Sequence, residues 1–213
     1  TATLTQLVGI DFSENLLGGR ALWSLNASKV ADKLHLAMET DGLGLISRLP
    51  SPLTKAEAVV GKITVNFTRD QSGQLIESHL FENTTILGQI DRDLVTLEVL
   101  TPEIDLMGWA GISGSAKEGR NLAMLLRIDQ VLVGEDSLSV DEIALNLRRD
   151  YFDVSFDGSD LSGRVERTGS GPILIDLERL ALPGDRNFLD PPSEDSLSAF
   201  NPGKIPSLRL TIG

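Results

Sequence analysis

The sequence predicts an all-β protein, a long antiparallel meander that forms one curled, groove-forming sheet with little helix. Apolar and polar residues alternate with a period of two over many successive stretches, as in strands with one apolar and one polar face. Short segments with turn residues separate these stretches, and helical periodicity is nearly absent from the 213 residues. Few gaps have the length of a crossover, which favours a single long sheet.

The alternating stretches define the candidate apolar face. Successive side chains of a strand point to opposite faces, so every second residue shares a face. Fourteen residues are the candidates for that face and for any groove it lines: Leu34, Leu36, Met38, Ile63, Val65, Phe67, Val95, Leu97, Val99, Ile143, Leu145, Leu147, Val154 and Phe156. Only residues 26–32 and 54–59 are expected to hold a turn or two of helix.

The turns between these stretches are typical of hairpins. They are expected at residues 69–74, 134–136, 157–159 and 168–171, each of which contains Gly. Glycine adopts positive φ without steric cost, as tight hairpin turns require. Strands of about 5–9 residues joined in this way form a meander.

One segment, 183–206, interrupts the strand pattern. It contains five prolines together with Ser and acidic residues, and proline cannot donate a hydrogen bond to a sheet. We therefore expect a loop or linker between sheet segments there. The chain opens on Thr1 and stops directly after the strand-like residues 208–212, so residues 1–213 are expected to be a single β-rich segment of a larger protein.

Composition excludes several classes of partner and chemistry. The net charge is −12 and the basic residues are scattered, which argues against nucleic acid and against docking on anionic headgroups through a polybasic patch. Any lipid must then be held by its tails. Cysteine is absent, which excludes disulfides and thiol chemistry, and no cofactor is expected.

Candidate catalytic groups are few, and the chain is expected not to be an enzyme. The two histidines, His35 and His79, lie in alternating stretches and are interpreted as polar surface. Residues 111–115 come nearest to a nucleophile elbow but lack its G-x-S-x-G spacing. Acidic groups such as Asp153, Asp157 and Asp160 match no calcium-binding spacing and are interpreted as a solvated face, so no metal site is expected.

Both tryptophans, Trp23 and Trp109, lie near glycine-rich segments. A tryptophan in such a place can anchor at a membrane interface or pack at the rim of a core. Rim packing is the commoner role and is the one expected.

Four short motifs, in order, resemble those of AsmA-like proteins of the YhdP type. Residues 18–23 are similar to the family's "G-G-x-x-x-W" strand entry, and 51–55 to its "P-x-P-L-x-K" stretch. Residues 172–183 resemble a strand ending in "L-x-L-P". After a variable gap, 202–212 resemble the "P-x-x-(I/L)-P-x-L-x-L-x-I" strand.

The resemblance implies a function and a location. AsmA-like proteins are Gram-negative envelope proteins with an N-terminal inner-membrane anchor and a periplasmic body. That body is a curled sheet, open along one side, whose apolar groove is thought to conduct phospholipids toward the outer membrane. The implied partners of this chain are phospholipid acyl chains and the rest of the same polypeptide, with no nucleic acid.

One alternative stays open at the level of sequence. Two sheets packed face to face bury the same alternating residues in a dry sandwich core. The chain would then be a structural spacer or a protein-interaction module of an envelope protein.

Overall fold

The computed structural model describes residues 16–71, 73–81, 83–91, 93–110, 121–134, 136–181 and 208–212. Over these residues the protein is all-β, with eighteen strands and one short helix. The predicted all-β class with little helix is thereby confirmed for these residues. No described helix has the length and apolar composition needed to cross a membrane.

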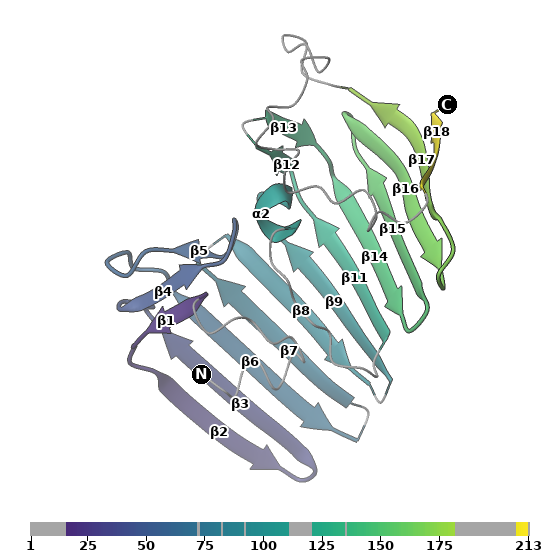
Figure 1. The fold of residues 1–213 in the computed structure, drawn as a ribbon. Helices are drawn as coiled ribbons and strands as arrows, with labels where there is room; N and C mark the ends of the chain where they lie inside the picture. Colours follow the sequence, from purple (N-terminus) through teal and green to yellow (C-terminus); the bar gives the residue numbers. More distant parts are fainter. Residues whose placement is uncertain are drawn as a thin grey trace.

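Twelve strands form one large sheet, and they follow one another across it in the order of the sequence (Figure 1). They are β2 (Ser24–Val30), β3 (Lys33–Thr40), β6 (Ile63–Asp70), β7 (Gly73–Leu80), β8 (Thr84–Ile90), β9 (Leu94–Leu100), β11 (Asn121–Arg127), β14 (Glu142–Arg148), β15 (Tyr151–Asp157), β16 (Leu161–Thr168), β17 (Ile173–Leu180) and β18 (Leu208–Ile212). This sequential order is that of a meander. The sheet does not close, because β2 and β18 do not pair with each other.

Two neighbouring pairs depart from the predicted antiparallel arrangement. β9 pairs with β11 in parallel, and β17 pairs with β18 in parallel. Parallel neighbours need a long connection that returns the chain to the starting end of the sheet. The first connection contains further strand and helix, and the second includes the predicted loop at 183–206, which lies outside the described residues.

Two three-stranded sheets and the helix lie at one end of the large sheet, above its strands in Figure 1. The first contains β1 (Leu17–Gly19), β4 (Leu45–Arg48) and β5 (Thr54–Lys55). The second contains β10 (Glu103–Asp105), β12 (Gln130–Val133) and β13 (Asp136–Ser139). The helix α2 (Leu106–Ala110) directly follows β10 in the sequence. We call these two sheets with α2 the rim.

The expected helical turns at 26–32 and 54–59 are wrong. Residues 24–30 form β2, which pairs with β3 over its whole length, and Thr54 and Lys55 form β5. Strand pairing satisfies the backbone donors and acceptors that a helix would satisfy locally, so tertiary context overrides a weak local preference.

The second small sheet arises because three neighbouring strands bend together. β9 leads into β10, β11 into β12, and β13 into β14. At the bend the backbone amides of Asp129 and Gln130 both donate to the Pro102 carbonyl, at 3.0 and 3.1 Å, and the Ile128 amide donates to the Asp141 carbonyl at 3.1 Å. These bonds replace the sheet ladder where the strands change direction.

The bend closes a core between the β12–β13 hairpin and one end of the large sheet. Val131 and Val140 are almost fully buried, and their cluster contains Leu126, Ile128, Leu138 and Ile143. Residues of β9, β15 and β16, including Val99, Phe156 and Leu161, pack against it. The hydrophobic core therefore lies at the rim and does not extend along the large sheet.

The predicted hairpin turns are confirmed. Residues 69–74, 134–136, 157–159 and 168–171 each join two strands, and Gly73, Gly134 and Gly169 have positive φ. Gly158 serves a different need: a Cβ there would lie 2.5 Å from the Ser139 carbonyl oxygen. The turn can approach the β13 segment only because this position has no side chain.

Candidate functional site

The register of the large sheet aligns apolar residues in a row that crosses eleven strands. Residues paired directly across neighbouring strands share a face. The central row consists of Ala27, Leu36, Phe67, Ile76, Gly88, Leu97, Met124, Leu145, Val154, Val165 and Ile175. No polar residue interrupts this row. At about 4.8 Å per strand it extends for about 48 Å.

All fourteen candidates from the sequence lie on this same side, which we call the apolar face. In β3 the candidates are Leu34, Leu36 and Met38, which pair with residues of β6. The register of the later strands places Val154 and Phe156 on the same side of the sheet. Of the fourteen, only Ile143 is buried, and Leu147 is 36% exposed. The other twelve are partly exposed, although Val99, Val154 and Phe156 pack against the core at the rim.

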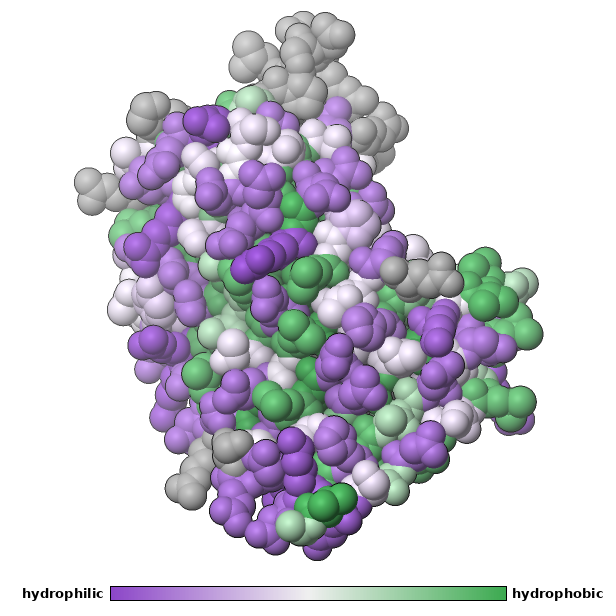
Figure 2. Space-filling model, turned by 180° about the vertical axis from the view of Figure 1, so that it is seen from behind, coloured by the Kyte–Doolittle hydropathy of each residue, from purple (hydrophilic) through white to green (hydrophobic). Residues whose placement is uncertain are grey.

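The opposite face, which we call the polar face, is mainly polar but also carries exposed leucines such as Leu75 and Leu87. Figure 2 views the molecule from behind and shows hydrophilic residues over most of that surface, with hydrophobic ones between them toward its centre. Arg164 ion-pairs there with Asp153 and Glu166. Hydrogen bonds to Asp153 and Tyr151 raise the pKa of the Arg164 guanidinium above its ordinary value. The Arg164 side chain is exposed, whereas Asp153 is half-buried.

The histidines also lie on the polar face and do not meet. His35 contacts Thr68 through Nδ1 at 3.2 Å. His79 lies two strands away, where Nδ1 contacts Thr85 at 3.0 Å and Nε2 contacts Glu77 at 3.2 Å. No group of three or more His, Asp or Glu in the described part of the chain is arranged to hold a metal ion.

The acidic and serine motifs have ordinary places or cannot be placed. Asp153 pairs with Arg164, and an Asp160 carboxylate oxygen accepts from the Ser139 amide at 2.8 Å. Both are therefore engaged in structure. Residues 111–115, which were compared with a nucleophile elbow, lie outside the described residues.

The rim is continuous across the end of the apolar face. The Ser51 hydroxyl donates to a Glu103 carboxylate oxygen at 2.7 Å, which joins the loop after β4 to β10. The Trp109 indole Nε1 donates to the Ser51 carbonyl at 2.8 Å, and the Asp105 amide donates to the same oxygen at 3.2 Å. Trp109 therefore packs at a rim, as expected, and ties α2 to the first small sheet.

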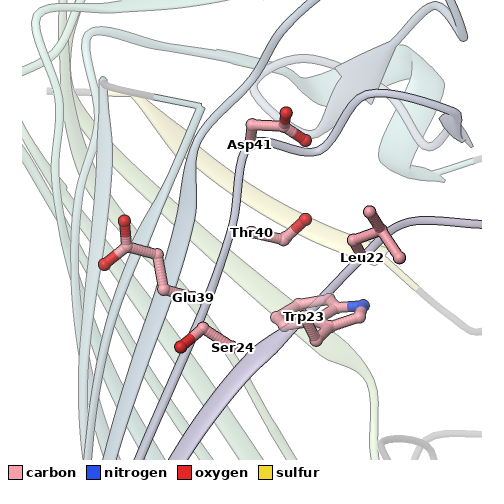
Figure 3. A pocket seen from close by; sticks show the side chains of 6 residues that line it. All are labelled: Leu22, Trp23, Ser24, Glu39, Thr40 and Asp41. Atoms are coloured by element: carbon pink, nitrogen blue, oxygen red, sulfur yellow. The ribbon is translucent and has the colours of Figure 1, made fainter.

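A shallow hollow of about 340 Å³ lies where β2 begins (Figure 3). It is lined by Leu22, Trp23, Ser24, Glu39, Thr40 and Asp41. Trp23 is 43% exposed and Leu22 is 92% exposed. Glu39 ion-pairs with Lys62 and Thr40 accepts from the Gly42 amide, so these polar groups are engaged in structure. The hollow offers no arrangement of catalytic groups.

The sequence interpretation missed three charged residues on the apolar face. Lys29 pairs with Leu34, Leu34 pairs with Arg69, and Arg167 pairs with Phe152. All three belong to the row at the end of the strands away from the rim, next to the β2–β3, β6–β7 and β14–β15 hairpins. We call this end of the apolar face the hairpin margin. Among register-paired residues on this face none is Asp or Glu, whereas the whole chain carries 31 acidic and 19 basic residues.

Comparison with known proteins adds no assignment. No protein-family model, no curated protein and no solved structure gives a significant match to this chain.

Proposed function

We propose that the apolar face binds the acyl chains of phospholipids, and that the chain takes part in non-enzymatic phospholipid transport between membranes. The observation that supports this most is the uninterrupted central row, which is partly or fully exposed at every position except Gly88. A continuous apolar surface of this length is unusual on a soluble monomer and marks an interaction site.

The energetics favour a lipid tail over a small polar ligand. Each buried methylene contributes about 0.8 kcal/mol, so exposing a 16-carbon tail to water costs on the order of 10 kcal/mol. Aliphatic side chains such as Leu36, Leu97 and Leu145 give many similar contacts. No site on the row then binds much more tightly than the next, which permits movement along it.

Partial exposure argues for this function over the dry sandwich. A second sheet packed on the apolar face would bury its residues, as β12 and β13 bury Ile143 at the rim. Val65, Phe67 and Leu97 are instead partly exposed. We propose that the predicted groove is this open face, bounded at one end by the rim.

The ordered motifs support a location of the proposed function in the envelope. They support a periplasmic segment of an AsmA-like, YhdP-type protein, continuous with an inner-membrane anchor and supporting the lipid supply of the outer membrane. Ser51 lies in the motif at 51–55, and its hydrogen bonds with Trp109 and Glu103 tie the rim together. The motif thus stabilises the structure that borders the lipid-binding face.

Substitution by aspartate tests the proposal. Val65→Asp and Leu97→Asp place a charge on the apolar face, where desolvating a carboxylate against an acyl chain is costly. Native mass spectrometry of purified protein is expected to find phospholipid on the wild type and at least about tenfold less on either variant, the change that 1.4 kcal/mol produces.

Adjacent residues on the polar face provide matched controls. Asn66→Asp and Thr96→Asp add the same charge one residue away, on exposed positions of the same strands. They are expected to retain lipid, and circular dichroism is expected to show all four variants folded. Equal lipid content in all four variants, or none in the wild type, would reject the proposed function.

A further inference from the structure

The charges on the apolar face are confined to one margin. Lys29, Arg69 and Arg167 occupy the row beside the hairpins, and the rows between it and the rim carry no charge among their paired residues. A chain with a net charge of −12 has more acids than bases to place. Three bases and no acid on this face therefore need an explanation beyond composition.

These basic groups lack protein partners. Among the described residues neither Lys29 nor Arg69 forms a hydrogen bond or ion pair through its side chain, and both are exposed. The Nε atom of Arg167 is buried with no hydrogen-bond partner. A buried donor of a charged group is costly to leave unsatisfied, so a ligand that accepts from it gains affinity.

Building on the proposed function, we propose that these side chains bind the phosphate of phospholipid headgroups, with Lys29 and Arg69 at one position and Arg167 at another. The acyl chains then lie along the strands from the hairpin margin toward the rim. Guanidinium groups bind phosphate through paired, charge-assisted hydrogen bonds, and lysine binds it as a point charge.

The spacing of the cations fits two headgroup positions. Lys29 and Arg69 flank Leu34 on alternate strands, about 10 Å apart at two strand spacings, which two long side chains span around one phosphate. Arg167 lies on β16, seven strands from β6, or about 34 Å. One phosphate cannot bridge that distance.

The depth of the face fits a tail. Three row spacings, from Leu34 to Thr40, separate the margin from the rim, and at about 6.6 Å per two residues this distance is about 20 Å. One leaflet of a bilayer core is about 15 Å thick, half of its 30 Å. A phospholipid with its phosphate at the margin therefore ends its tails before the rim.

Electrostatic repulsion does not contradict this assignment. The net charge of −12 argues against docking on an anionic membrane surface through a polybasic patch. Single phosphates at an acid-free margin need only local cations, because charges further away than about 8–10 Å are largely screened at physiological salt.

The test compares two lipids that differ only by the headgroup phosphate ester. Delipidated protein is mixed with vesicles of dioleoyl phosphatidylglycerol containing a minor fraction of dioleoylglycerol, and the lipid retained after re-purification is quantified by mass spectrometry. The test variant is Lys29→Gln/Arg69→Gln/Arg167→Gln. Its matched control is Lys33→Gln/Arg148→Gln, which removes exposed cations from the polar face at the same end of the strands.

For the wild type and the control, we expect the ratio of retained phosphatidylglycerol to retained dioleoylglycerol to exceed the ratio in the vesicles by at least about fivefold, consistent with one charged hydrogen bond. The triple variant is expected to retain both lipids in vesicle proportions. Glycerol 1-phosphate in the aqueous phase is expected not to displace the lipid.

Three results would overturn the assignment. Retention of both lipids in vesicle proportions by the wild type leaves the acyl-chain function intact and removes the headgroup assignment. Retention of neither lipid removes the proposed function itself. Binding of free glycerol 1-phosphate that the triple variant loses, without any lipid enrichment, would show a small-anion site instead.

Discussion

At the scale of single residues, the apolar face is defined as much by small residues as by large ones. Gly88 lies in the central row between Ile76 and Leu97, and a Cβ there would lie 3.2 Å from a Leu97 methyl. Gly163 lies on the same face at a register shift, where β17 has one residue more than β16. These positions let neighbouring side chains cover the backbone.

Gly163 is a residue at which a single methyl group is expected to be costly. Its φ is 149°, and a Cβ would lie 2.4 Å from the Asp176 carbonyl oxygen. Gly163→Ala is therefore expected to lower the free energy of unfolding in urea by about 2–4 kcal/mol, from backbone strain and a steric clash together.

Gly134→Ala is the control for Gly163→Ala. Gly134 also has positive φ, at 66°, but nothing lies within 4 Å of the added Cβ. Its expected cost is about 1 kcal/mol. Equal costs at the two positions would show that the close approach at the bulge does not restrict Gly163.

The strand pattern made some of these residues predictable and hid others. Leu36 and Leu145 alternate with polar neighbours and so were assigned to the correct face. Lys29, Arg69 and Arg167 interrupt the apolar alternation, so they read as polar neighbours or strand ends. Only the register, which aligns Lys29 with Leu34 and Leu34 with Arg69, shows that they share a face.

At the scale of elements, alternation predicted amphipathic strands well and other strands poorly. All fourteen candidates fall on β3, β6, β9, β14 and β15. None falls on β8 or β11, because Gly88 leaves a gap in β8 and β11 is apolar on both sides through Leu125 and Leu126. Period-two reasoning needs a polar face to contrast with the apolar one.

The rim could not be predicted from periodicity. The segments β10, β12 and β13 read as short continuations of neighbouring strands. The Pro102 carbonyl turns them onto the sheet by accepting from two amides of another strand. Contacts between residues so far apart in the sequence leave no mark on local patterning.

The β12–β13 hairpin is expected to supply much of the packing energy. Val131 is 2% exposed and contacts the core at the rim, so Val131→Ala is expected to cost about 2 kcal/mol of unfolding free energy. Leu145→Ala removes one carbon more but lies on the open face, and is expected to cost about 1 kcal/mol or less.

Thermal and urea denaturation check this ranking. A greater loss from Leu145→Ala than from Val131→Ala would mean that the open face is packed in solution, as in a sandwich. The ranking thus separates a rim-based core from a core that extends along the sheet.

At the scale of the whole molecule, the closest packing is concentrated at one end of the large sheet. Among the described residues only eight hydrophobic side chains are buried, and six of them form the cluster at the rim. Most other residues of the apolar face are partly exposed. Fold class and meander order followed from alternation and turn chemistry, whereas the open face and its rim depend on register and strand bending.

The most direct measurement of the central claim uses the absence of cysteine from the chain. Leu145→Cys and Ala144→Cys each offer one attachment site for an environment-sensitive fluorophore, on adjacent residues of β14 that face opposite sides of the sheet. On addition of phosphatidylglycerol vesicles, the emission of the label at 145 is expected to shift to the blue as an acyl chain covers it, and that of the label at 144 to stay unchanged. No shift at 145, or equal shifts at both positions, would contradict acyl-chain binding on the apolar face.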